Sequence, residues 1–522
     1  MKKVLTKIAF SIALGALLFG CTEGFEDLNT DPLALDIGAL EESQVLQGQA
    51  FAQAQYVSVN GLHWRFQISQ NLFSDIWAQY FATTAAGFDS DRYVQVGRWA
   101  DLAWGSFYGQ AAPQIKLVED LSEANGNDVG NAMAKILRVH AYHRITDYWG
   151  PVPYSAFGNG ELSVPYDSQE SMYADFFTTL DDAVAKLNAN TGGSSYAGSD
   201  RMYGGDAAKW LRFANSLRLR LALRIKYVDP GKAQAEAEKA VAAGVIEDNA
   251  DNAFVETDDI NRNPLETITD WGEFRMSATM ESILEGYGDP RMPEYFAPAL
   301  DGDSDADGSD YEGLQNGQTR VALETSKNAG HSDVATKFID VARGGSNPPI
   351  ELMNAAEMFF LRAEGALEGW NMGGTAQSLY EDGIRASMTQ KTAADGAAID
   401  AYIASTAVPV EFEAGSGPVT DIPVAFGADA ETQLEQIITQ KWLAIYPNGW
   451  EAWAELRRTG YPKQYARIES QNPDVGVNEI MRRMVYVTSE FDTNGEAVQA
   501  AIALPEMSGG DKNNTKVWWD KK

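Results

Sequence analysis

The chain has 522 residues, of which 44 % are apolar and 11 % aromatic, so it can bury a large core and is not a disordered protein. The formal net charge is −33 and no basic run offsets it, which excludes nucleic acid as a partner because the phosphate backbone would repel the chain. Length alone predicts about three domains, but no change of composition divides the chain.

The first twenty residues have the features of a bacterial signal peptide. Three lysines among the first seven residues form a basic end, and the apolar run 8–19 is twelve residues long, shorter than the roughly 20 residues that span a bilayer. The run ends at Leu18-Phe19-Gly20-Cys21, which resembles a lipobox, although Phe19 is larger than usual there. We predict removal of residues 1–20 and lipidation of Cys21. An ordinary secretion signal with an incidental cysteine is the alternative.

Cys21 is the only cysteine, so the exported chain can form no internal disulfide and the residue is most simply an acylation site. More than one acyl chain there would give a stable membrane anchor. Loss of the three lysines of the signal peptide changes the net charge from −33 to −36. The acidic, turn-rich sequence after the cysteine predicts a solvated tether over 21–40, followed by a single helical domain over 41–522.

Helical periodicity dominates the remainder of the chain. Apolar residues recur at spacings of three and four, as in amphipathic helices, over 101–123, 129–148, 173–187, 210–221, 352–369, 375–388 and 434–445. Short Gly/Asn turns at 125–127 and 371–374 join two pairs of these segments into helical hairpins. Stacked hairpins of this size resemble tetratricopeptide repeats. We therefore predict a mainly α fold with a scaffold of helix pairs.

Long segments without this periodicity separate the helices. They are 83–100, 149–169, 189–205, 247–275, 300–350, 389–428 and 470–522. Loops of this length in a compact protein are usually functional, so we expect these segments to form a ligand-binding site. Short strands are expected near 484–488 and 498–504, with little sheet elsewhere.

Two of these loops combine aromatic and polar side chains in a way that suits a sugar. A ring packs against the C–H face of a sugar, while polar side chains bond its hydroxyls. The ligand-binding candidates are Phe88, Asp89, Arg92, Tyr93 and Trp99 in the first loop, and Asn263, Trp271, Phe274 and Arg275 in the second. The alternative is that these rings fill the core of the scaffold, because large aromatic side chains are highly buried on average.

An acidic segment is a candidate calcium site. Its candidate ligands are Asp303, Asp305, Asp307, Asp310 and Glu312. The first three, with Gly308, match the first half of an EF-hand loop, but Leu314 stands where the bidentate glutamate belongs. A solvated acidic loop is the alternative.

Catalytic motifs find little support in the sequence. His140 and His143 lie one helical turn apart without a third ligand spaced with them, which favours two packed helix positions over a metal site. The sequence has no Gly-x-Ser-x-Gly motif and no phosphate-binding loop, and no carboxylate pair stands in a recognisable glycosidase context. We therefore predict that the protein is not an enzyme and needs no cofactor, with a calcium ion as the one open alternative.

Several segments together resemble the SusD/RagB family of glycan-binding lipoproteins, in the same order along nearly the whole mature chain. They are Phe25-Glu26-Asp27-Leu28-Asn29, Tyr148-Trp149-Gly150-Pro151-Val152-Pro153, Asp289-Pro290-Arg291, Ala356-Glu357-Met358-Phe359-Phe360-Leu361-Arg362-Ala363-Glu364, Trp450-Glu451-Ala452-Trp453-Ala454-Glu455-Leu456-Arg457-Arg458 and Val517-Trp518-Trp519-Asp520. The resemblance implies a helical scaffold under a loop-rich face, with ligand contacts from the two aromatic loops. It also implies export to the cell surface by the acidic stretch after Cys21.

The resemblance further implies a partner, a SusC-like TonB-dependent transporter of the outer membrane over which the lipoprotein closes. We therefore expect a lipid-anchored protein at the outer membrane, facing the exterior, that captures an oligosaccharide and delivers it to that transporter. Two alternatives stay open. One is a surface glycoside hydrolase on a helical scaffold, and the other is a SusD-like binder of peptide or of another non-sugar nutrient.

Overall fold

The computed structural model describes residues 44–522 apart from 60, 162, 305, 326–327 and 340, and within them Gln47–Lys522 forms one compact unit, to which the following description refers. The signal peptide predicted over 1–20, the lipidation site Cys21 and the tether predicted over 21–40 lie outside the described residues. Among the described helices, none is both long enough and apolar enough to cross a membrane.

The unit is mainly helical, as predicted. The first half contains α4 (Gln44–Ser58), α5 (His63–Phe66), the π-helical η1 (Gln67–Asp75), α6 (Gly97–Ser106), the π-helical η3 (Phe107–Ala111), α7 (Ala112–Ala124), α8 (Asp128–Trp149), α9 (Gln169–Ala189), α10 (Ala207–Arg224) and α11 (Pro230–Ala243). The second half contains α12 (Pro264–Thr269), α13 (Ala278–Gly286), α14 (Met292–Tyr295), α15 (Arg320–Thr325), α16 (Ala355–Leu367), α17 (Ala376–Lys391), α18 (Gly396–Ile403), α19 (Ala430–Ala444), α20 (Gly449–Thr459) and α21 (Thr488–Ile502).

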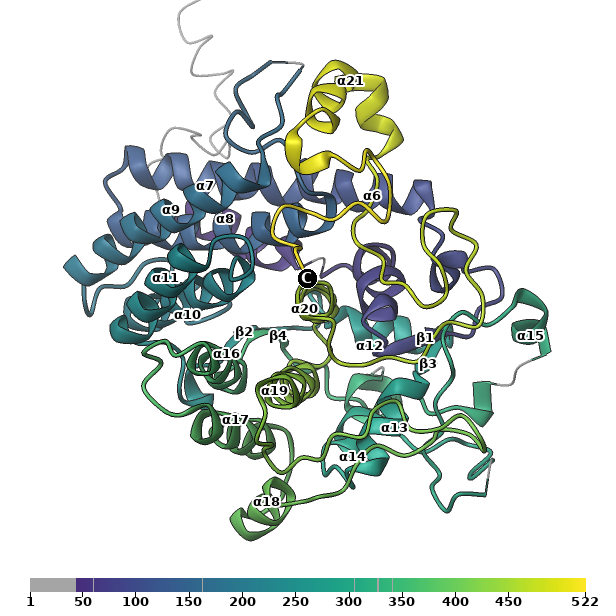
Figure 1. Ribbon diagram of the computed structural model, residues 1–522. Helices are drawn as coiled ribbons and strands as arrows, with labels where there is room; N and C mark the ends of the chain where they lie inside the picture. The colour runs from purple at the N-terminus through teal and green to yellow at the C-terminus, as the bar shows by residue number, and fades with distance from the viewer. Residues whose placement is uncertain (1–43, 60, 162, 305, 326–327, 340) are drawn as a thin grey trace, which may run out of the picture. The chain divides into compact units, whose positions relative to one another are not determined.

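Consecutive helices pack as hairpins, which confirms the predicted tetratricopeptide-like scaffold. The helices α7 to α11 pack in sequence, each against the next, and α16 packs against α17 and α19 (Figure 1). Polar caps set the helix starts: the Asn127 side chain accepts from the Gly130 amide at α8, and Thr375 and Ser378 form a reciprocal capping box at α17. The segment predicted as one helix over 101–123 continues from α6 through the π-helical turn η3 into α7.

The described part of the chain contains two short sheets, each an antiparallel pair of strands. Strand β1 (Phe81–Thr83) pairs with β3 (Phe274–Met276), and β2 (Ala253–Val255) pairs with β4 (Ile350–Met353). The strands predicted near 484–488 and 498–504 are wrong, because most of both segments belongs to α21 or to backbone without a ladder. In the second segment Val498 and Ala501 face the core from one side of α21, a helical spacing that resembles strand alternation over a few residues.

A buried network of ion pairs joins α8, α10, α16, α19 and α20. Arg458 Nη1 lies 2.6 Å from Glu364 Oε1, and Arg224 Nη1 lies 2.8 Å from Glu455 Oε1. Lys441 Nζ lies 3.0 Å from Glu451 Oε1, and all six side chains are at most 5 % exposed. The charged positions of the family segments around 357–364 and 450–458 thus hold the helices together rather than forming a site.

We expect this network to make the protein sensitive to acid. Burial alone would raise the pKa of Glu364 and Glu455, but the surrounding Arg458, Lys226, Lys441 and Arg224 hold both at about 2. Because an unfolded glutamate has a pKa of about 4.3, the folded state binds fewer protons, and this stabilisation is present above that value and lost as the pH falls towards 2. The melting temperature should therefore fall steeply below about pH 4.3, and less steeply in Glu455→Gln. Equal slopes in the two proteins would contradict this account.

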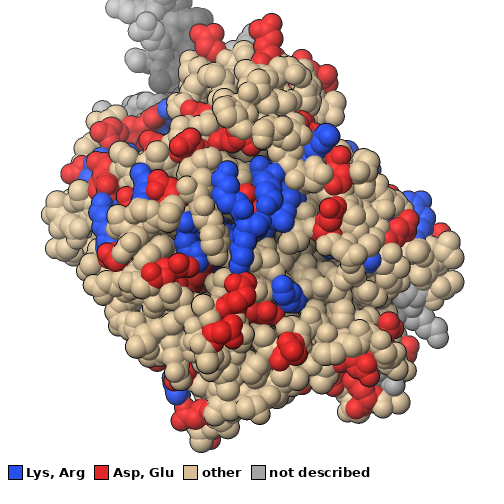
Figure 2. Space-filling view, in the orientation of Figure 1, with Lys and Arg blue, Asp and Glu red and all other residues tan. Residues whose placement is uncertain are grey.

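The charge of the surface is not uniform. Figure 2 shows Asp and Glu side chains spread over the visible face, with a group of Lys and Arg side chains gathered near the C-terminus. On this face the acidic side chains are therefore scattered rather than gathered in one patch.

Candidate ligand-binding surface

The two loops proposed to bind ligand lie side by side. In the β1–β3 ladder Phe81 pairs with Met276 and Thr83 with Phe274, so the segments that precede β3 and follow β1 meet at one end of the ladder. The contact continues beyond the strands, because the Thr84 amide donates to the Glu273 carbonyl at 3.0 Å. Residues nearly 200 positions apart in the chain therefore form a single surface.

The turn before β3 is fixed by hydrogen bonds to three other segments of the chain. Gly272 lies at its centre with φ +66°, a conformation that favours glycine, and its carbonyl accepts from Asn328 Nδ2 at 2.6 Å and from Thr84 Oγ1 at 3.1 Å. The Glu273 carboxylate accepts from Gln67 Nε2 at 2.6 Å. This bond links the turn to η1, directly after α5. The turn is thus positioned by segments from three parts of the chain.

Two tryptophans are exposed at this place. Trp64 on α5 is 38 % exposed and Trp271, two residues after α12, is 42 % exposed, while α5 packs against α12. The guanidinium of Arg65 lies 4.9 Å from the centroid of the Trp64 ring. We call Trp64, Arg65, Trp271 and Glu273 the tryptophan surface. Its two rings can cover the C–H faces of sugars, while the guanidinium and the carboxylate can bond hydroxyls.

Three of the nine predicted ligand-binding residues keep part of their side chain accessible. Trp271 belongs to the tryptophan surface, and Phe88 and Asp89 are half-buried beside the ladder. Phe88 contacts the ring of Trp99 edge-on at 5.3 Å, and Asp89 forms an ion pair with Arg320 at 3.0 Å. Because both side chains are half-buried and already have partners, Phe88 and Asp89 can contact a ligand only at the edge of the binding surface.

The other six predicted residues are buried, so the expectation that they present their side chains to a ligand is not met. They are Arg92, Tyr93, Trp99, Asn263, Phe274 and Arg275. The three rings fill the core, as in the alternative stated for the sequence: Phe274 packs on Phe81, Trp99 on Phe73, and Tyr93 under the guanidinium of Arg467.

The polar members of this buried group have structural partners. Arg92 donates to the Gln318 carbonyl at 2.9 Å, and Arg275 to the carbonyl of Phe274 at 2.7 Å. Asn263 caps α12 through the Leu265 amide and donates to the Pro348 carbonyl at 2.9 Å. These bonds fix the backbone of the loops, and Asn263 also lines an internal pocket.

Trp64, Arg65 and Glu273 were not among the predicted residues. Trp64 and Arg65 lie in a four-residue helix that precedes a π-helix, and neither element shows the regular apolar spacing by which the scaffold helices are recognised. The only local signal was that Trp64 stands directly between two polar residues, His63 and Arg65.

The acidic loop is closed by its own backbone rather than arranged as an EF-hand. Asp303 accepts from the amides of Ala306 and Gly308, Asp310 accepts from the Asp303 amide, and Glu312 accepts from Ser304. Asp305 lies outside the described residues. The carboxylates of these predicted ligands are therefore directed to loop amides, which uses oxygens that a calcium ion would need.

Asp307, another predicted metal ligand, lies instead beside two glutamates of α13. One carboxylate oxygen of each of Glu281, Glu285 and Asp307 lies within 4.8 Å of the others. Calcium binding stays a prediction, and these three residues are the group that could hold the ion, since calcium prefers carboxylate oxygens. A calcium titration should raise the melting temperature of the protein and leave that of Glu281→Gln unchanged. An equal rise in both proteins would contradict this location.

Comparison with known proteins agrees with the fold. Residues 27–520 match the family described as SusD-like, Susd and RagB outer membrane lipoprotein. A chitin-binding SusD homologue from Flavobacterium johnsoniae is 36 % identical, with a TM-score of 0.82, and the match covers 92 % of this chain and 99 % of that chain. A SusD homologue from Bacteroides uniformis is 35 % identical, with a TM-score of 0.81 over 91 % of this chain and 99 % of that chain. A search of curated protein sequences found no match.

The helical fold and the match over residues 27–520 together define a class of outer membrane lipoproteins. The chain belongs to the SusD/RagB family of that class.

Proposed function

We propose that this protein captures an oligosaccharide on the tryptophan surface and passes it, uncleaved, to a SusC-like TonB-dependent transporter of the outer membrane. The observation that carries the proposal is the pair of exposed tryptophans: Trp64 lies beside Arg65 on α5, and Trp271 lies in the fixed turn that carries Glu273. Exposed indole rings beside charged groups suit a ligand with both an apolar face and hydroxyls.

Chitin fragments are the first ligands to test. The solved relative from Flavobacterium johnsoniae, 36 % identical, is described as chitin-binding, and a second chitin-binding relative is 28 % identical. An N-acetylglucosamine unit offers an apolar ring face to a tryptophan, and its hydroxyls and acetamido group can bond Arg65 and Glu273. This similarity supports a β-linked amino-sugar oligosaccharide as the ligand of the present chain.

The proposal is tested by calorimetric titration with a panel of soluble ligands. The panel contains chito-, manno- and gluco-oligosaccharides, together with short peptides that represent the non-sugar alternative. We expect saturable binding of at least one oligosaccharide and none of the peptides. Peptide binding without sugar binding would support the alternative of a SusD-like binder of a non-sugar nutrient.

The membrane anchor gives a separate prediction. We propose that Cys21 is acylated and that the protein faces the cell exterior, since the family is one of outer-membrane lipoproteins. Cys21→Ala should lose the lipid and move the protein from the outer-membrane fraction to the soluble fraction, because the acyl chains are its proposed attachment to the membrane. Fractionation with an antibody against the chain measures this. A variant that stays in the membrane fraction and still carries lipid would contradict the proposal.

A further inference from the structure

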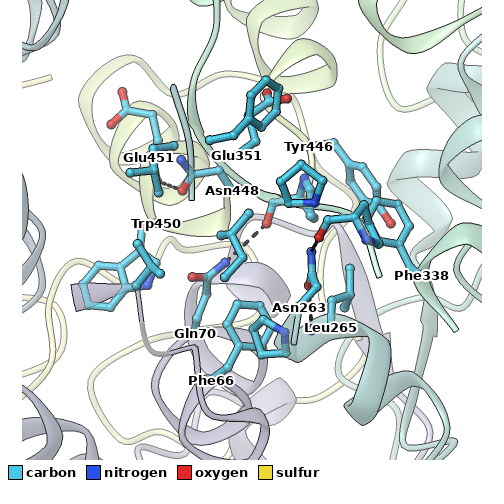
Figure 3. Close-up of a pocket in the computed structure, with 18 of the residues that line it drawn as sticks. Phe66, Gln70, Asn263, Leu265, Phe338, Glu351, Tyr446, Asn448, Trp450 and Glu451 are labelled. Atoms are coloured by element: carbon cyan, nitrogen blue, oxygen red, sulfur yellow. Dashed lines mark hydrogen bonds between the residues drawn. The ribbon is translucent and has the colours of Figure 1, made fainter. Parts of the chain in front are cut away.

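A pocket of about 1160 Å³, its mouth included, lies inside the unit on the other side of α5 and α12. Phe66 and Leu265 from these helices line it, together with residues of α8, α10, α20 and the segment 337–352. Figure 3 shows the labelled side chains of Phe66, Leu265, Phe338 and Trp450 arranged around a central space. About 180 Å³ of this space admits water-sized atoms, many times the roughly 15 Å³ that one water needs, so the pocket can hold a small molecule. The exposed Trp64 and Trp271 do not line this pocket.

One wall of the pocket is polar, and most of its charges are already paired. Arg220 is bound by Glu357 at 2.6 Å, and Asp147 is bound by Arg224 at 3.2 Å. At the mouth, Lys391 is bound by Glu351 at 2.6 Å. These groups fix the shape of the pocket and leave little charge for a ligand.

Arg144 differs from the other charged residues of the wall. Its guanidinium donates to two neutral acceptors, the Ser58 carbonyl at 3.0 Å and Gln70 Oε1 at 3.3 Å, and it forms no ion pair with the described residues. A guanidinium has five N–H groups, and these two bonds use two of them. The cation lies 4.6 Å from the centroid of the Trp450 ring.

The groups around Arg144 do not supply a carboxylate that compensates its positive charge. Burial lowers the pKa of Arg144 to about 10, which shows that the neighbouring acids do not compensate the loss of water. Of the two acids that act on it, Glu451 is engaged by Arg224 and Lys441, and burial raises the pKa of Asp75 to about 7. An anionic group of a ligand would therefore meet a cation that the protein itself leaves without a carboxylate.

Neutral hydrogen-bonding groups lie beside this cation. Burial lowers the pKa of both His140 and His143, so the two imidazoles are uncharged near neutral pH. His140 Nδ1 has no hydrogen-bond partner among the described residues, and His143 uses Nδ1 towards the Val139 carbonyl, which leaves its Nε2. Neutral imidazole nitrogens are suited to hydroxyl groups, while the ring of Phe66 suits an apolar face.

We propose that this pocket binds an acidic monosaccharide, a hexuronic acid, with Arg144 as the partner of its carboxylate and the two histidines beside its hydroxyls. Such a sugar has one carboxylate, several hydroxyls and an apolar ring face. The pocket offers a cation for the carboxylate, neutral polar groups for the hydroxyls and apolar side chains for the ring face. The site is separate from the tryptophan surface and adds a second ligand to the function proposed above.

The test is calorimetric titration of the purified protein with glucuronate and, at the same concentrations, with glucose. We expect saturable binding of glucuronate and binding of glucose weaker by about tenfold or more, the size of one charge-assisted hydrogen bond. Arg144→Gln should weaken glucuronate binding by about the same factor. The matched control Lys463→Gln, which removes a charge from an exposed lysine outside the pocket, should bind as the parent protein does.

A second variant keeps the test decisive if Arg144→Gln fails to fold. Gln390 is half-buried among the lining residues and donates to Glu351 at 2.5 Å, and Gln390→Trp should fill part of the pocket and weaken glucuronate binding. Trp271→Ala should leave glucuronate binding unchanged, which separates this site from the tryptophan surface. No binding of glucuronate, equal binding of glucose, or full binding by a folded Arg144→Gln or Gln390→Trp would overturn the proposal.

Discussion

Glu455→Gln is expected to lower the free energy of unfolding by about 3–5 kcal/mol, the cost of removing one partner of a buried ion pair. Glu455 contacts Arg224 at 2.8 Å, Arg458 at 2.5 Å and Lys441 at 3.5 Å, and it is 5 % exposed. The amide keeps the size of the side chain but removes its charge. Three cations would then share the remaining carboxylates, and the loss would be electrostatic rather than a matter of packing.

The matched control is an ion pair at the surface. Arg385 and Asp400 form a contact in which the side chains are 44 % and 62 % exposed, so Asp400→Asn should change stability by no more than about 1 kcal/mol. Denaturant unfolding of the parent protein and the two variants measures both effects. A Glu455→Gln variant as stable as Asp400→Asn would mean that the network contributes no more than a surface pair.

Trp271→Ala and Trp64→Ala should each weaken oligosaccharide binding by about 1–2 kcal/mol, or roughly 5–30-fold, as expected for an aromatic contact in a binding hot spot. The double variant should bind too weakly to titrate. Because both rings are partly exposed, the melting temperature should change little. Titration and thermal unfolding of the same samples separate a loss of contact from a loss of fold.

Two further variants make this prediction specific. Phe491, on α21, is 38 % exposed but lies outside the tryptophan surface, so Phe491→Ala should leave binding unchanged. Trp99 is buried against Phe73 and Phe88, and Trp99→Ala should cost about 3–5 kcal/mol of stability. Normal binding by the Trp64→Ala/Trp271→Ala double variant would show that the ligand binds elsewhere.

The scaffold could be predicted from the sequence because its helices repeat one simple pattern. The apolar stripes of 129–148 and 375–388 correspond to α8 and α17, and the Gly/Asn turns before them end their partner helices. The irregular parts could not be read in this way. The π-helical segment η1, the short helix α12 and the kinked helix α21 carry no sustained period, so their location depends on the tertiary contacts that they make.

The candidate site was predictable only as two loops, not as a set of side chains. Alternating aromatic and polar residues marked the segments that β1 and β3 bring together, but the pattern does not say which ring points inward. Phe274 and Trp271 are three residues apart, and the ladder buries the first while the turn at Gly272 leaves the second exposed. Trp64 and Arg65 join the surface only because α5 packs on α12.

The most direct test of the central claim follows one oligosaccharide through binding and prolonged incubation with the same protein. Calorimetry first establishes saturable binding of a chito-oligosaccharide, and chromatography then compares the ligand before and after incubation at saturating concentrations. The account predicts binding that the Trp64→Ala/Trp271→Ala double variant loses, and a ligand that is recovered intact. Products that increase with protein concentration and disappear when one carboxylate is replaced would contradict it and would identify a surface glycoside hydrolase instead.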